Sequence, residues 1–128
     1  MLCGTLFTSC KKAAEEIFKG RVIDAMTTGQ WHMVKFTKGG ADITGDFSPY
    51  LFQFHENNTV DALNSGAVEK TGTWSADVGA RTITSLFTNA TTPLSLLNGT
   101  WNITDNSWTR VVASQTVNGE VLTLRLQK

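Results

Sequence analysis

Few side chains in this sequence have the types and spacing that catalysis requires. The two histidines, His32 and His55, each alternate with core-type residues, where a lone histidine is most simply solvent-facing or hydrogen-bonded. The carboxylates Asp42, Asp46 and Glu56 lie in or beside turns, where acidic side chains usually bond the local backbone rather than a cation. The sequence contains no Gly-x-Ser-x-Gly motif of serine hydrolases, no His-Glu-x-x-His motif of zinc proteases and no glycine-rich loop that would bind phosphate. We therefore expect a protein that is not an enzyme and that needs no metal or cofactor.

Both cysteines lie at the N-terminus. Because Cys3 and Cys10 fall within the first ten residues, the rest of the chain has neither a disulfide nor a thiolate metal site. Residues 6–10, Leu-Phe-Thr-Ser-Cys, resemble the end of a bacterial lipoprotein signal, in which lipid is attached to the cysteine after cleavage before it. Phe7 replaces the usual leucine, and the charged start of a signal is absent. We expect residues 1–10 to be a truncated lipoprotein signal with lipidation at Cys10; the alternative is an ordinary unstructured N-terminus.

Aromatic side chains are a better indication of function than the polar ones. They recur in strand-like segments, so in a closed barrel they would share an interior that is only wide enough to be filled or to hold one small ligand. The expected walls of an apolar pocket are Met33, Tyr50, Phe52, Phe54, Trp74 and Trp108. The alternative is that these side chains fill the interior.

Length and charge restrict the class of protein. A chain of 128 residues is most simply one domain with a real hydrophobic core. Its 11 basic and 11 acidic side chains balance, and no basic cluster recurs along one face. We therefore expect a monomer without a nucleic-acid partner.

Two kinds of periodicity divide the chain at Gly29. In residues 11–28, the apolar residues Val22, Ala25 and Met26 fall at helical spacings, and Gly29 is placed to end a helix. We expect an amphipathic helix that packs on the rest of the chain; the alternative is a partly ordered tether between lipid and domain. Residues 29–128 instead alternate with a period of two, and turn residues recur every eight to twelve positions.

This alternation predicts eight short strands. They lie at about residues 30–38, 48–55, 59–63, 68–76, 81–87, 101–104, 107–114 and 120–127. In the first, Trp31 and Met33 should share one face, with Phe36 on the other. Residues 88–98 interrupt the rhythm and predict a short helical lid or plug, capped by Thr92 with Pro93 at its first position.

Short connections between antiparallel strands favour one fold class. We predict an all-β protein whose eight strands form a closed up-and-down barrel, preceded by a short N-terminal helix. Closure is favoured because it also removes the exposed edges that an open sheet would have. A β-sandwich is the alternative, although its crossovers require longer links.

The start of the first strand resembles a known motif. Gly29-Gln30-Trp31 after a short helix is similar to the Gly-x-Trp motif of lipocalins and other calycins, in which the tryptophan closes one end of the barrel. That resemblance implies a basic residue from the last strand against Trp31, for which Arg125 is the candidate, in a cation–π contact. It also implies that the barrel is lipocalin-like and that a ligand site should lie at the opposite end.

A closer resemblance is to the small lipocalin-like lipoproteins of Bacteroidetes. The motifs that carry it are residues 31–36, 46–54, 72–75, 96–101 and 122–124, together with Ser-Cys-Lys-Lys at residues 9–12. It implies a lipid-anchored barrel in the cell envelope of a Gram-negative bacterium, periplasmic or on the outer membrane. We expect the signal as it stands in this sequence to be too short for efficient export.

Two functions remain open at this point. One is a lipid-anchored barrel that binds a small apolar or amphipathic ligand without catalysis. The other is a protein-interaction or inhibitor barrel with a filled core, whose loops at residues 39–47 or 88–98 meet a partner.

Overall fold

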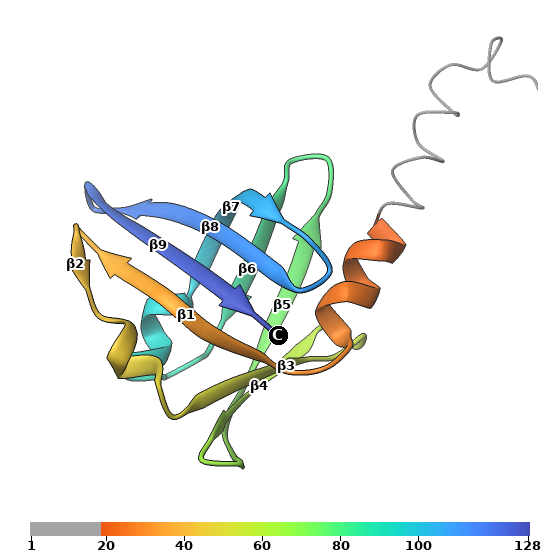
Figure 1. The fold of residues 1–128 in the computed structure, drawn as a ribbon, viewed down its shortest axis with the longest axis horizontal. Helices are drawn as coiled ribbons and strands as arrows, with labels where there is room; N and C mark the ends of the chain where they lie inside the picture. Colours follow the sequence, from red (N-terminus) through yellow and green to blue (C-terminus); the bar gives the residue numbers. More distant parts are fainter. Residues whose placement is uncertain (1–18) are drawn as a thin grey trace, which may run out of the picture.

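The strands close into a ring. A computed structural model describes residues 19–128, in which every strand pairing is antiparallel and β1 also pairs with β9 (Figure 1). The strands are β1 (Trp31–Lys38), β2 (Ala41–Asp42), β3 (Tyr50–Phe54), β4 (Thr59–Asn64), β5 (Ala67–Asp77), β6 (Thr82–Leu86), β7 (Gly99–Asn106), β8 (Arg110–Val117) and β9 (Glu120–Gln127). Eight of them form the barrel, and the two-residue β2 is an addition on β1. The predicted fold class is confirmed, and the sandwich is excluded.

The first strand contains a β-bulge that changes which side chains face the core. Its register against β9 shifts between Met33 and Lys35, so that Val34 is the extra residue. Phe36 consequently lies inside the barrel beside Trp31 and Met33, and it is fully buried. The prediction that Phe36 would face away from Trp31 was wrong, because uninterrupted alternation does not hold across a bulge.

One end of the barrel is plugged, and we call it the closed end. Two short 3-10 helices cover it, η1 (Thr44–Phe47) and η2 (Leu94–Leu97), each contributing buried side chains. The Phe47 ring lies 4.8 Å from the Phe36 ring, and the Trp101 indole donates a 2.9 Å hydrogen bond to the carbonyl of Leu97. The predicted plug is therefore present as η2.

The start of η2 differs from the prediction. Pro93 occupies the cap position, and no side chain caps the helix. Thr92 is not needed as a cap because the carbonyls of Thr91 and Pro93 already accept the backbone N–H groups of Ser95 and Leu96, at 3.0 Å each.

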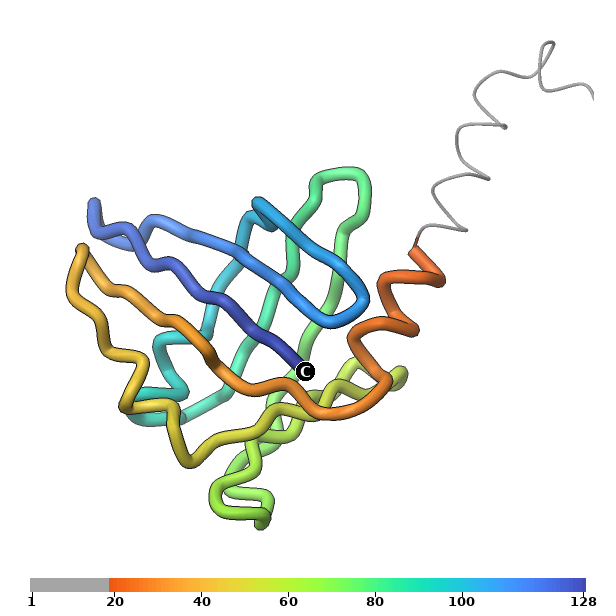
Figure 2. The backbone as a smooth tube through the Cα atoms, viewed as in Figure 1, coloured from red at the N-terminus to blue at the C-terminus, as the bar shows by residue number. Residues whose placement is uncertain are grey.

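The other end carries the N-terminal helix, and we call it the helix end. The described part of this helix covers residues 19–27, and Gly29 follows with φ +80°, a conformation that glycine adopts readily. Three hairpin turns lie at the same end, β3–β4, β5–β6 and β7–β8 (Figure 2). The expected helix is confirmed for this part; its predicted residues 11–18, the predicted signal remnant and Cys10 lie outside the described residues.

The β7–β8 hairpin turns later in the sequence than predicted. β7 continues to Asn106, and β8 begins at Arg110, because Asp105 and Asn106, the predicted turn residues, instead pair with Val112 and Val111. The Arg110 guanidinium pairs with the Asp105 carboxylate at 2.8 Å across the hairpin. Trp108, expected in a strand, therefore lies in the turn.

Candidate functional site

Two neighbouring spaces in the structure are candidates for a binding site. One is a cavity of about 50 Å³ inside the barrel, and the other is a groove of about 360 Å³ at the helix end. We call them the interior cavity and the mouth groove. Ligand pockets for small molecules typically have volumes of about 300–1,000 Å³. Only the mouth groove is therefore large enough for an organic ligand without rearrangement.

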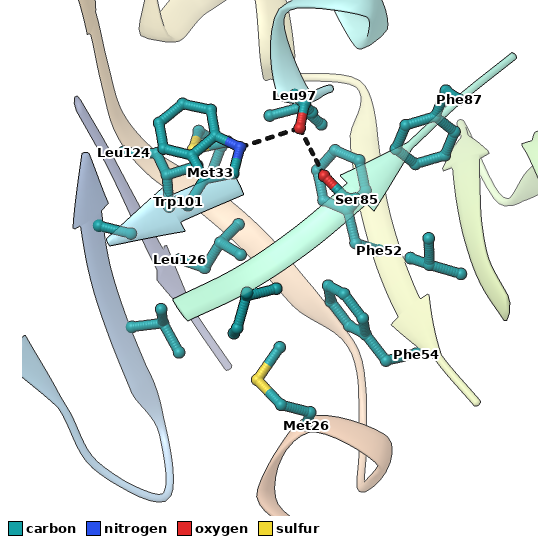
Figure 3. Close-up of a pocket in the computed structure, with 14 residues that line it drawn as sticks. Met26, Met33, Phe52, Phe54, Ser85, Phe87, Leu97, Trp101, Leu124 and Leu126 are labelled. Carbon is teal, nitrogen blue, oxygen red and sulfur yellow. Dashed lines mark hydrogen bonds between the residues drawn. The ribbon is translucent and has the colours of Figure 1, made fainter. Parts of the chain in front are cut away.

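The interior cavity is apolar along its whole length. Figure 3 shows Leu97 of η2 at one end and Met26 of the N-terminal helix at the other, with Met33, Phe52 and Phe54 between them. Its lining includes a single hydroxyl, that of Ser85, which donates a hydrogen bond to the carbonyl of Leu97 (Figure 3). An apolar space of this kind offers water too few partners and stays dry.

The mouth groove lies between the N-terminal helix and two hairpins. It is lined by Val22, Ala25 and Met26 of the helix; Ala76, Asp77, Val78, Gly79, Arg81, Thr82 and Ile83 of the β5–β6 hairpin; and Ile103, Asn106, Ser107 and Val111 of the β7–β8 hairpin. The helix stripe predicted from its periodicity is thus the stripe that faces the groove. Its floor is aliphatic, whereas its rim carries charged, hydroxyl and amide groups.

Three side chains separate the two spaces. Met26, Ile83 and Val111 line both the interior cavity and the mouth groove. All three are buried. Met26 is the unbranched member, and a thioether chain adapts to irregular space more easily than a β-branched one. Of the three, Met26 is therefore the side chain that can change its shape most easily.

A smaller hollow adjoins the mouth groove between the helix and the β7–β8 hairpin. It measures about 180 Å³ and is lined by Arg21, Val22, Ala25, Asn106, Ser107 and Trp108. Ala25 is one of four residues that line both spaces, together with Val22, Asn106 and Ser107. Trp108 is 56% exposed and forms part of the wall of this hollow.

The structure brings together three of the six residues predicted to line a pocket. Met33, Phe52 and Phe54 line the interior cavity. Tyr50 is buried outside that lining, where its hydroxyl donates to the Glu69 carboxylate at 2.7 Å.

The remaining two predicted lining residues lie elsewhere. Trp74 is buried against the edge of the Phe54 ring, and its indole donates to the carbonyl of His55 at 2.9 Å. Trp108 is not in the barrel interior, because the later turn carries it to the surface.

The predicted partner of Trp31 was wrong. Arg125 is exposed on the outer face of β9, between the buried residues Leu124 and Leu126, because alternate side chains of a strand point to opposite faces. Lys128 takes the predicted role instead, with Nζ at 4.9 Å from the centre of the fully buried Trp31 ring system. Burial lowers the pKa of the Lys128 ammonium group.

The larger open space does not lie at the end where the resemblance implies a ligand site. The end opposite Trp31 is the closed end, filled by Phe47, Leu94 and Leu97. The larger open space lies at the helix end, near Trp31, whose indole donates a 3.0 Å hydrogen bond to the carbonyl of Met26. Sequence reasoning missed the groove because it depends on where the helix docks, which no local pattern specifies.

The polar residues considered for catalysis remain dispersed. His32 is exposed, and His55 pairs with Asp61 at 2.8 Å on the outer surface. Asp42 bonds the backbone N–H of Thr44 at 2.9 Å, as expected of a turn carboxylate. Within residues 19–128, no three potential ligands from histidine, cysteine and carboxylate side chains come together to hold a metal ion. No helix in the same range is long and apolar enough to span a membrane.

Comparisons with known proteins support the fold. No known protein-family model and no curated protein sequence matches this chain significantly. A crystal structure of a DUF4847 family protein from Bacteroides vulgatus is similar over 83% of this chain and 96% of that one, with a TM-score of 0.59 and 16% sequence identity. At that identity the similarity shows the fold alone. The chain is therefore a barrel that resembles a Bacteroides protein in architecture.

Proposed function

We propose that this protein is a non-catalytic barrel that binds a small amphipathic molecule in the mouth groove. The observation that carries the proposal is the groove itself, about 360 Å³ of space with an aliphatic floor and a polar rim. Binding sites for small molecules combine such an apolar surface with a few polar groups that orient the ligand. The interior cavity, at about 50 Å³, supplies extra depth only if Met26 moves.

The proposal includes a location in the cell. A lipid on Cys10 would tether the barrel to the envelope of a Gram-negative bacterium, with eight residues between Cys10 and the described start of the helix at Lys19. A fully extended chain of that length spans at most about 30 Å. The N-terminal helix would thus hold the mouth groove close to the membrane, where amphipathic molecules are concentrated. Metabolic labelling with a radioactive fatty acid, compared between the wild type and Cys10→Ser, tests the anchor.

Ligand binding is tested with the purified barrel. Native mass spectrometry after gentle purification, followed by tryptophan quenching with fatty acids, sterols and tetrapyrroles, should identify a binder. Ala25→Phe adds a ring at a position that lines both the mouth groove and the smaller hollow, so we expect the affinity to fall at least about tenfold, equivalent to about 1.4 kcal/mol. Asp24→Phe, on the exposed side of the same helix, should bind like the wild type. Absence of any binder in the panel, or equal affinities of the two variants, would contradict the proposal.

A second function is supported by a different observation. The barrel interior is nearly filled, and within residues 19–128 five large apolar side chains are exposed, namely Val68, Leu86, Trp108, Val117 and Val121. Tryptophan is enriched among the residues that dominate protein interfaces. A protein-interaction barrel would use Trp108 as an anchor. Crosslinked pull-downs from envelope extracts should then recover one partner with the wild type and lose it with Trp108→Ala; recovery of the same partner with both would exclude this use of Trp108.

A further inference from the structure

We infer that the mouth groove selects amphipathic molecules with an anionic head group, and that Arg81 recognises that group. This inference rests on the proposed function and specifies its ligand class. The recognised chemistry is a carboxylate or phosphate attached to one aliphatic chain.

The backbone of Arg81 is held in place from two sides. Its N–H donates to the carbonyl of Val78 at 3.3 Å within the β5–β6 turn, and its carbonyl accepts from the N–H of Ile103 on β7 at 2.9 Å. Its φ of +58° is a conformation that few residues with side chains adopt. Arg81 is therefore fixed at the rim of the groove by the hairpin itself, while its side chain is exposed.

The Arg81 guanidinium makes no ion pair with any residue in the range 19–128, whereas Arg110 in the neighbouring hairpin is paired with Asp105. The other charged residue in the groove lining, Asp77, already accepts the backbone N–H of Ala80 at 3.0 Å. A free guanidinium presents several donors in a planar fork that fits a carboxylate or a phosphate. The rim thus offers a ready partner for an anion.

The charged residues that line the mouth groove and the smaller hollow beside it also favour an anionic ligand. Arg81 lines the mouth groove, Arg21 lines the adjoining hollow, and Asp77 is the one carboxylate among the lining residues of both. Two cations against one anion give a net charge of +1. A cationic head group would meet repulsion from both arginines, whereas an anionic one would be attracted.

The floor of the groove fits an aliphatic tail of moderate length. Val22, Met26, Ile83, Ile103 and Val111 form a surface without charged groups. The volume of about 360 Å³ lies at the lower end of the range of about 300–1,000 Å³ for small-molecule pockets. Decanoate, a small amphipathic molecule with one aliphatic chain, is therefore a suitable probe.

The test compares three probes that share one tail. Isothermal titration calorimetry of the full chain with decanoate, 1-decanol and decyltrimethylammonium should give decanoate at least about tenfold tighter binding than decanol, as a charge-assisted hydrogen bond implies. The ammonium compound should bind most weakly. Decyl phosphate, as a fourth arm, distinguishes a phosphate-type head group from a carboxylate.

Variants then assign the preference to Arg81. Arg81→Gln should remove the preference for decanoate over decanol, and Arg81→Lys should keep part of the preference. Arg125→Gln, which removes an exposed arginine from the outer face of β9, is the matched control and should bind all probes like the wild type. A thermal melt of each variant confirms folding.

The outcomes separate the two claims. If none of the probes binds the wild type, the proposed function fails together with this inference. If decanol binds as tightly as decanoate, the groove remains a binding site but selection of anions is overturned. If Arg81→Gln retains the full preference, Arg81 is not the recognition group.

Discussion

Met26 and Trp31 connect the N-terminal helix to the barrel: the Trp31 indole N–H donates a 3.0 Å hydrogen bond to the carbonyl of Met26. Met26 is also one of the three residues that separate the interior cavity from the mouth groove. The tryptophan at the start of β1 therefore holds the helix that forms one wall of the groove. A motif expected only to close the barrel also positions the candidate binding site.

Truncation of Met26 should destabilise the barrel and open its interior. Met26→Ala removes a buried side chain and joins the interior cavity to the groove, so we expect the free energy of unfolding to fall by about 2–4 kcal/mol. Urea denaturation measures the loss. Val68→Ala, at an exposed position on β5, should cost less than about 0.5 kcal/mol. Equal effects of the two changes would mean that Met26 does not pack as described.

The cation–π contact at the helix end can be measured by comparing two basic residues. Lys128→Ala removes the ammonium group above the Trp31 ring and should lower the free energy of unfolding by about 0.5–1 kcal/mol. Arg125→Ala should change it less, because Arg125 is exposed on the outer face. Chemical denaturation of both variants measures the two losses, and a loss at Arg125 as large as that at Lys128 would contradict a stabilising contact of Lys128 with Trp31.

Close packing between β5 and β6 makes Gly72 sensitive to substitution. A methyl group at Gly72 would clash with the carbonyl oxygen of Leu86 and lie 2.8 Å from Cδ1 of the Phe87 ring. We expect Gly72→Ala to destabilise the protein by about 1–3 kcal/mol, as overpacking does. Gly45→Ala is the control, since a methyl group there meets nothing within 4 Å. Thermal melts of the two variants should therefore differ clearly, and identical melting temperatures would refute the strand register.

The Asp61 carboxylate should contribute to acid sensitivity. Hydrogen bonds from Thr71 and then from His55 lower its pKa below the ordinary value of 3.8. Because the folded state holds the proton less tightly than the unfolded state, this contribution is present above about pH 4 and is lost as the pH falls through the lowered pKa. Melting temperatures of the wild type and Asp61→Asn should therefore differ at pH 6 and converge at acidic pH. A constant difference across that range would show that the pKa is not lowered.

The sequence predicted those elements whose alternation is uninterrupted. β9, Glu120–Gln127, has the predicted bounds, because Asn118 and Gly119 adopt the positive φ of a tight hairpin and the strand after them alternates cleanly. The errors elsewhere have two causes. The extra residue Val34 in the β1 bulge places Phe36 in the core, and β7 continues through Asp105 and Asn106, which leaves Trp108 in the turn. Local sequence carries little signal for a bulge, since it depends on the register of a partner strand.

The candidate site was harder to predict than the fold. Met33, Phe52 and Phe54 were expected to line a cavity and do so. The mouth groove combines the N-terminal helix with two hairpins that follow much later in the sequence, and its polar rim includes Arg81, which lies in a turn. Turn residues show no periodicity, so their convergence appears only in three dimensions.

A backbone-amide NMR titration with decanoate tests the central claim most directly. If the ligand binds in the mouth groove, chemical-shift changes should concentrate at Val22, Ala25, Val78 and Ser107, with little change at Phe47 and Leu94 of the closed end. Changes centred on the closed end, or none at saturating decanoate, would contradict the assignment of the groove as the binding site.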